Sequence, residues 1–80
     1  MTRAVPVIVE RSPGGGRGWC IRVDGKGRFL FCTAVEALEV AVRKLGLLGA
    51  DLTERVRVAR LLSAELGRMR RAEITAEVAA

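Results

Sequence analysis

Histidine is absent from the 80 residues of this chain. Its absence removes the side chain that most often acts as a general base or as a neutral metal ligand. The two cysteines, Cys20 and Cys32, cannot close a zinc site alone and have no carboxylate beside them in the sequence. Ser12 and Ser63 lack a base that would activate them as nucleophiles. We therefore predict a protein without catalytic activity, metal, cofactor or small-molecule substrate.

Long apolar runs are also missing, since none approaches the ~20 residues that a membrane-spanning helix needs. The short N-terminal apolar patch breaks at Pro6 and Glu10 and shows no cleavage pattern, so no signal peptide is expected. We expect a cytoplasmic protein without membrane contact, with its cysteines as reduced thiols. A chain of this length is expected to form a single domain over residues 1–80.

Aromatic residues are scarce and fall in one segment, at Trp19, Phe29 and Phe31. The alternation of apolar and polar residues predicts three antiparallel strands within residues 4–33. Pro6 has no amide hydrogen, which favours an edge position for the first strand. The other two strands are predicted to form a hairpin whose three aromatic side chains share a buried face.

The predicted hairpin turn is the three-residue loop Gly25-Lys26-Gly27, with Gly27 in a left-handed bulge position. This loop keeps the aromatic rings on one face. It places Asp24 opposite Arg28, Arg22 opposite Leu30, and Cys20 opposite Cys32.

Capping patterns predict two helices after the sheet. Thr33 and Glu36 form a capping box, Gly46 or Gly49 closes the first helix, and Asp51 opens the second together with Glu54. We predict helices over residues 34–48 and 52–72 and a C-terminal tail over 73–80. The expected fold class is α+β, a three-stranded antiparallel sheet followed by two helices (β-β-β-α-α).

The net charge of +5 is unevenly distributed along the chain. Residues 1–32 hold six basic and two acidic residues, a net charge of +4, whereas residues 33–80 hold eight basic and seven acidic ones. Twelve of the fourteen cations are arginine, which suits bidentate contact with phosphate or carboxylate. The surplus indicates a polyanion or an acidic protein surface as the partner.

The sheet face opposite the aromatic rings is predicted to mix apolar and cationic side chains: Ile8, Cys20, Arg22, Arg28, Leu30 and Cys32. A face that only contacts water does not need these apolar groups, so partner binding is one interpretation. Three alternatives stay open. The second helix covers this face, the N-terminal arm covers it, or two copies of the chain pair there.

Helical spacing places four arginines on one side of the second helix: Arg57, Arg60, Arg68 and Arg71. The expected inner face of that helix is apolar, with Leu52, Val56, Ala59, Leu62, Leu66 and Met69. A solvated helix face is the simpler interpretation of the arginines, and a binding face is the alternative.

The pattern Gly18-Trp19-x-Ile21-Arg22, a glycine turn, then Phe31-x-Thr33-x-x-Glu36-Ala37 resembles two groups of small domains. One is the three-strands-plus-helix DNA-binding domain of phage integrase arm-binding regions and plant ethylene-response factors. The other is a set of short uncharacterised bacterial proteins with the same skeleton. The first resemblance implies that arginines on the exposed sheet face enter the major groove. The matching positions are Arg22 and Arg28, with Arg17 and Lys26 at the loops.

The sequence therefore predicts a non-enzymatic basic binding module whose partner is nucleic acid or a nucleoprotein complex. Its candidate contact residues are Arg17, Arg22, Lys26, Arg28, Leu30, Arg57, Arg60, Arg68 and Arg71. The alternative is a stoichiometric inhibitor or adaptor of phage or mobile-element origin, similar in type to anti-CRISPR proteins, that blocks nucleic-acid binding by a protein complex. A homodimer joined through Ile8, Leu30 and the thiols is a third possibility.

Overall fold

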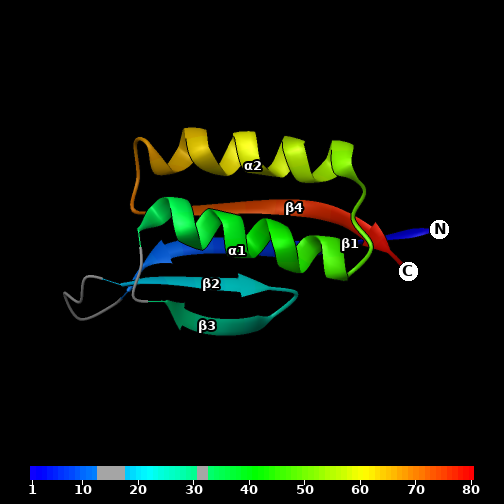
Figure 1. Ribbon diagram of the computed structural model, residues 1–80, viewed down its shortest axis with the longest axis horizontal. Helices are drawn as coiled ribbons and strands as arrows, with labels where there is room; N and C mark the ends of the chain where they lie inside the picture. Colours follow the sequence, from blue (N-terminus) through cyan, green and yellow to red (C-terminus); the bar gives the residue numbers. More distant parts are fainter. Residues whose placement is uncertain (13–17, 31–32) are drawn as a thin grey trace.

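Four strands and two helices form the computed structural model, which describes residues 1–12, 18–30 and 33–80, with the backbone alone for residues 28–30 (Figure 1). In chain order the elements are β1 (Thr2–Arg11), β2 (Trp19–Val23), β3 (Lys26–Leu30), α1 (Ala34–Leu47), α2 (Leu52–Leu66) and β4 (Arg71–Ala79). The structure confirms the predicted α+β class with an antiparallel sheet and two helices. The sheet has a fourth strand, however, and the helices lie between β3 and β4.

The segment expected to be a tail forms β4, and α2 ends at Leu66 rather than at residue 72. Apolar residues alternate with polar ones along β4, and Ala72, Ala76 and Val78 are buried. This period of two is the pattern of a strand with one buried face. The prediction of a long second helix followed by a tail was therefore wrong.

The strand order is β3-β2-β1-β4, so β1 is an interior strand and the edge position predicted from Pro6 was wrong. The carbonyl of Pro6 accepts a hydrogen bond from the Asp24 amide at 3.0 Å. Because the nitrogen and the oxygen of one strand residue point to the same side, the missing amide hydrogen of Pro6 faces Asp24, beyond the end of β2. The pairing of β1 with β4, in which Pro6 lies opposite Thr75, is left intact.

A two-residue turn joins β2 to β3, and it shifts the predicted hairpin register by three residues. Asp24 and Gly25 have φ values of 58° and 80°, the two positive values that a type I′ turn requires. Arg22 consequently pairs with Gly27 rather than with Leu30. Leu30 pairs with Trp19, and Arg28 pairs with Ile21. The predicted register was therefore wrong, and with it the basis for placing Arg22, Arg28 and Leu30 on one face. The predicted contact of Cys20 with Cys32 and the position of Phe31 lie outside the described residues.

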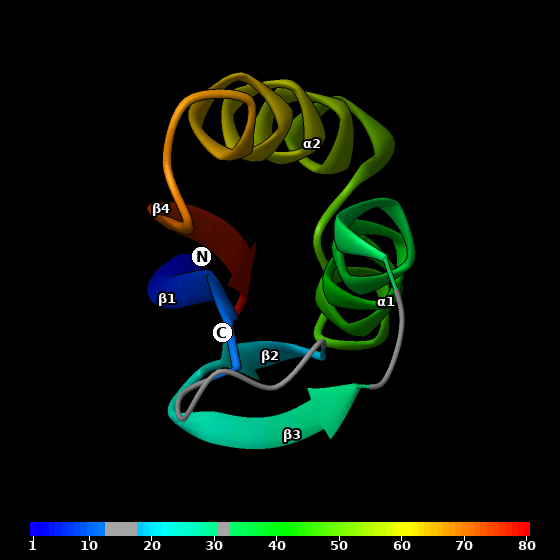
Figure 2. The same ribbon diagram turned by 90° about the vertical axis from the view of Figure 1, so that its left-hand side faces the viewer.

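Both helices cover the same face of the sheet, with α2 over β4 and α1 over β2 (Figure 2). The core between them is built from valines of β1 and small or branched residues of the other elements, including Val5, Val7, Val9, Ile21, Ala37, Ala41, Leu45, Val58, Leu62 and Val78. Trp19 is half-buried and packs against this cluster, as predicted. The inner face of α2 is centred on Val58 and Leu62, whereas Leu52, Val56 and Met69 are exposed, which corrects the predicted apolar face.

Both predicted N-caps are present, but among the described residues no hydrogen bond returns from the Thr33 amide to the Glu36 side chain, so the predicted capping box is half formed. Thr33 Oγ1 accepts from the Glu36 amide at 3.2 Å, and Asp51 Oδ1 accepts from the Glu54 amide at 2.8 Å. Gly49 follows α1 with a φ of 99°. The amide of Ala50 donates to the Leu45 carbonyl, and that of Gly49 donates to the Gly46 carbonyl. These two bonds form a Schellman motif, so Gly49 is the residue that ends α1.

Candidate functional site

Arg57 holds α2 against the edge of the sheet through its hydrogen bonds. Its guanidinium binds the Glu54 carboxylate through two hydrogen bonds of 2.6 and 2.8 Å and donates a third to the Thr75 carbonyl at 2.8 Å. Glu54 Oε2 also accepts from the Glu77 amide at 2.6 Å. We call Glu54, Arg57 and the two backbone groups of β4 the edge clamp. It occupies groups on the outer edge of β4 that another strand would otherwise pair with.

The hydrogen bonds and the charge of Arg57, together with the Glu77 amide, lower the pKa of Glu54 to about 2 despite partial burial. The same pairing raises the pKa of Arg57 above its ordinary value. The edge clamp is therefore fully ionised at neutral pH, and the charge of Arg57 is neutralised by a carboxylate of its own chain.

Arg68 and Arg71 are also paired with carboxylates. Arg71 lies in β4, with nitrogen–oxygen distances of 3.3 Å to Glu10 and 3.0 Å to Glu73. Arg68 follows the end of α2 and lies 3.7 Å from Glu65. Of the four arginines predicted on one face of the second helix, only Arg57 and Arg60 belong to α2, so the predicted stripe was wrong.

The other cations of the predicted contact set differ from these paired arginines. Within the described part of the chain, no carboxylate pairs with Arg22, Lys26 or Arg60, and all three are exposed. Arg22 lies on the sheet face away from the helices, and its side chain passes over Gly27 of β3. Arg17 lies outside the described residues, and for Arg28 and Leu30 only the backbone is described. The side-chain contacts of these three residues stay predictions.

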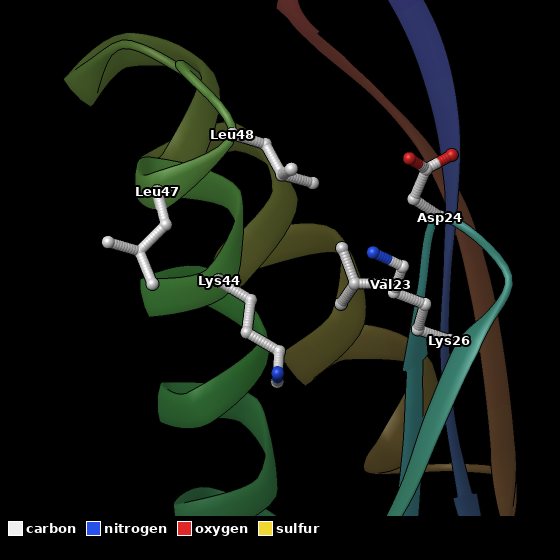
Figure 3. Close-up of a pocket in the computed structure, with 6 residues that line it drawn as sticks. All are labelled: Val23, Asp24, Lys26, Lys44, Leu47 and Leu48. Carbon is white, nitrogen blue, oxygen red and sulfur yellow. The ribbon is translucent and has the colours of Figure 1, made fainter.

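An open pocket of about 170 Å³ lies between the β2–β3 turn and the C-terminal end of α1 (Figure 3). Two amino groups point into it from separate elements, that of Lys26 from β3 and that of Lys44 from α1. Val23 lies between them, and Leu48 points from α1 towards the hairpin. Leu47 completes the rim. The pocket therefore combines two positive charges with an apolar floor.

Asp24 also lines this pocket, but its carboxylate is already engaged. It accepts a hydrogen bond of 2.9 Å from Arg3, and this bond and the charge of Arg3 lower the pKa of the Asp24 carboxyl. The negative charge of Asp24 is therefore balanced mainly from β1, and the charge of Lys26 lowers the pKa of this carboxyl to a smaller extent. Neither ammonium group has a carboxylate partner within the described residues.

Sequence reasoning missed Lys44, because its place in the pocket depends on how α1 packs across the hairpin. The placement of Lys26 could have been predicted from the residues that precede it. The dipeptide Asp24-Gly25 is a strong type I′ turn sequence and makes Lys26 the first residue of β3 instead of the middle of a loop.

The sheet face opposite the helices is less apolar than predicted. Cys20 is only 2% exposed and so offers no thiol to a partner. Ile8 is half-buried and lies between Arg22 of β2 and Glu73 of β4. The described residues contain no cluster of three or more side chains suited to a metal ion.

The solvent side of α2 carries a second candidate surface. Leu52, Val56 and Leu61 are large apolar side chains with exposed fractions of 66%, 41% and 41%. They line an open groove together with Arg57 and Arg60. We call this surface the α2 outer face.

No family model, no curated protein and no solved structure matches the chain. Among the described residues no helix is long and apolar enough to span a membrane.

Proposed function

We propose that this chain is a small non-enzymatic binding module that contacts nucleic acid through Arg22, Lys26 and Lys44, here called the hairpin cations. The observation that supports the proposal is the division of the cations. Arg57, Arg68 and Arg71 are matched with carboxylates, whereas no carboxylate in the described structure pairs with the hairpin cations. Counterion release by a polyanion depends on such unmatched charges.

These charges come from the hairpin and from α1 and point in two directions. Arg22 extends across the outer face of the sheet, and Lys26 and Lys44 point into the pocket on the helix side. A phosphate backbone that passes the hairpin contacts charges on both sides of it. Arginine and lysine differ in this role, because arginine binds a phosphate bidentately while the ammonium of lysine acts as a point charge.

Binding of a fluorescently labelled oligonucleotide, followed by anisotropy at several salt concentrations, tests the proposal. Three phosphate contacts predict an affinity that falls roughly 20- to 40-fold between about 50 and 200 mM salt. An affinity independent of salt, or no binding at the lowest salt concentration, would contradict the proposed function.

A second candidate function, docking on a protein of a nucleoprotein complex as an inhibitor or adaptor, is favoured by the α2 outer face. An exposed row of large apolar side chains is unusual on a monomer unless it meets a partner. The exposed guanidinium of Arg60 beside it suits an acidic protein surface. This function predicts no binding of free oligonucleotide, recovery with a nucleic-acid-bearing complex, and loss of that recovery in Val56→Ser.

A further inference from the structure

The two ammonium groups of the pocket repel one another unless an anion lies between them. They come from β3 and α1 on either side of Val23, which is 4% exposed, and the one carboxylate that lines the pocket among the described residues, that of Asp24, is hydrogen-bonded to Arg3. A phosphate group placed between the amines replaces their repulsion by two attractive contacts. The pocket is small, at about 170 Å³, so it accepts one such group and not the surface of a duplex.

The apolar side chains of the pocket favour a different part of a ligand from the one that the two ammonium groups bind. Leu48 is half-buried at its wall, and Leu47, which is 83% exposed, lies at the outer rim with its side chain directed away from the hairpin. A phosphate makes no favourable contact with these apolar side chains. An apolar surface that reaches them loses water on contact, and this loss is favourable.

Of the two forms of nucleic acid, the single strand supplies both of these parts at neighbouring positions. In a duplex the base faces are stacked on one another, and the protein meets phosphates, sugars and groove edges. In a single strand an unstacked base has a free face beside its own phosphate. We propose that Lys26 and Lys44 hold one phosphate of a single strand while the adjoining base leaves the pocket across Leu48 towards the exposed rim at Leu47. This inference rests on the proposed function and narrows it to single strands.

The test compares one oligonucleotide as a single strand and as a duplex, with the full chain and four variants. Lys44→Gln removes a pocket charge, and Arg43→Gln removes the neighbouring charge, which does not line the pocket. Leu47→Gln removes the exposed apolar rim, and Val35→Gln removes an apolar side chain that is 63% exposed on the same helix, away from the pocket. All four positions are exposed or half-buried, so the variants are expected to fold.

We expect the unmodified chain to bind the single strand at least about fivefold more tightly than the duplex. Lys44→Gln is expected to reduce the slope of log K against log salt by about 0.7 for the single strand, and Arg43→Gln to leave it unchanged. Leu47→Gln is expected to weaken single-strand binding about fivefold with an unchanged salt slope, and Val35→Gln to have no effect.

Equal affinities for the two forms, or equal effects of Leu47→Gln and Val35→Gln, would overturn the inference. The proposed function would survive that result, because salt-dependent binding through the hairpin cations does not require a single strand. If the unmodified chain bound neither form at low salt, the proposed function would fail, and the inference with it.

Discussion

Gly49 shows how one residue determines the path between α1 and α2. Its φ of 99° lies in the region that L-residues with a Cβ atom rarely adopt. A Cβ atom at this position would lie 2.5 Å from the Cβ of Ala79 in β4. The end of α1 and the last strand therefore approach one another only because residue 49 has no side chain.

We expect Gly49→Ala to lower the free energy of unfolding by about 1–3 kcal/mol, through backbone strain and contact with Ala79. Urea unfolding followed by the fluorescence of Trp19, the one tryptophan, measures this change. Gly46→Ala is the matched control. Gly46 lies inside α1, and its new Cβ would meet only the flexible Arg55 side chain at 3.4 Å. Gly46→Ala is expected to be neutral or stabilising by up to ~1 kcal/mol, and equal losses in both variants would contradict the account.

Single residues with strong local preferences could be predicted from the sequence. Thr33 and Asp51 are the N-caps that their side chains indicated, and Gly49 is one of the two predicted stops. The register of the hairpin was missed because Lys26 and Gly27 were assigned to a loop, although Asp24-Gly25 suffices for a two-residue turn. The resulting shift is three residues, and because this number is odd it reverses the face of every position on β3 relative to β2.

At the scale of elements, β4 was missed because its composition suits a helix as well as a strand. Alanine and glutamate, which favour helices, make up much of Arg71–Ala79. Strand formation there depends on antiparallel pairing with β1, which begins 60 residues or more earlier in the chain, and on the edge clamp from α2. Local propensity takes no account of these two contacts, and here they override it.

The edge clamp predicts a pH-dependent contribution to stability. The pKa of Glu54 is about 2 in the folded chain and takes its ordinary value, near 4.5, when unfolded. A carboxyl with a depressed pKa stabilises the fold above its unfolded pKa and loses that contribution as the pH falls through the folded value. We expect Glu54→Gln to cost about 1–2 kcal/mol at pH 7, and the difference from the unmodified chain to shrink between about pH 4.5 and 2.

Unfolding of both chains at a series of pH values measures this difference, with Glu65→Gln as the control. Glu65 contacts Arg68 at 3.7 Å on the surface, where an ion pair contributes at most about 0.5 kcal/mol. A cost for Glu54→Gln that stayed constant down to pH 2 would show that the carboxylate of Glu54 does not hold β4 through its charge.

For the whole molecule, the sequence indicated a basic surplus in its first 32 residues, but it could not show which cations are neutralised. The pairing of Arg71 with Glu10 joins residues about 60 positions apart, on β4 and β1. Lys44 and Lys26 line the same pocket only because α1 packs beside the hairpin. The candidate site was thus partly predicted, through Arg22 and Lys26, while its third cation depends on tertiary packing.

The most direct test of the account is a comparison of two charge-matched double variants in oligonucleotide binding. Arg22→Gln/Lys26→Gln and Arg68→Gln/Arg71→Gln each remove two positive charges, so the net charge is the same in both. The hairpin variant is expected to reduce the slope of log K against log salt by about 1.4–1.8, and the other variant to leave it nearly unchanged. Equal reductions would show that net charge, and not the unmatched cations of the hairpin, determines binding.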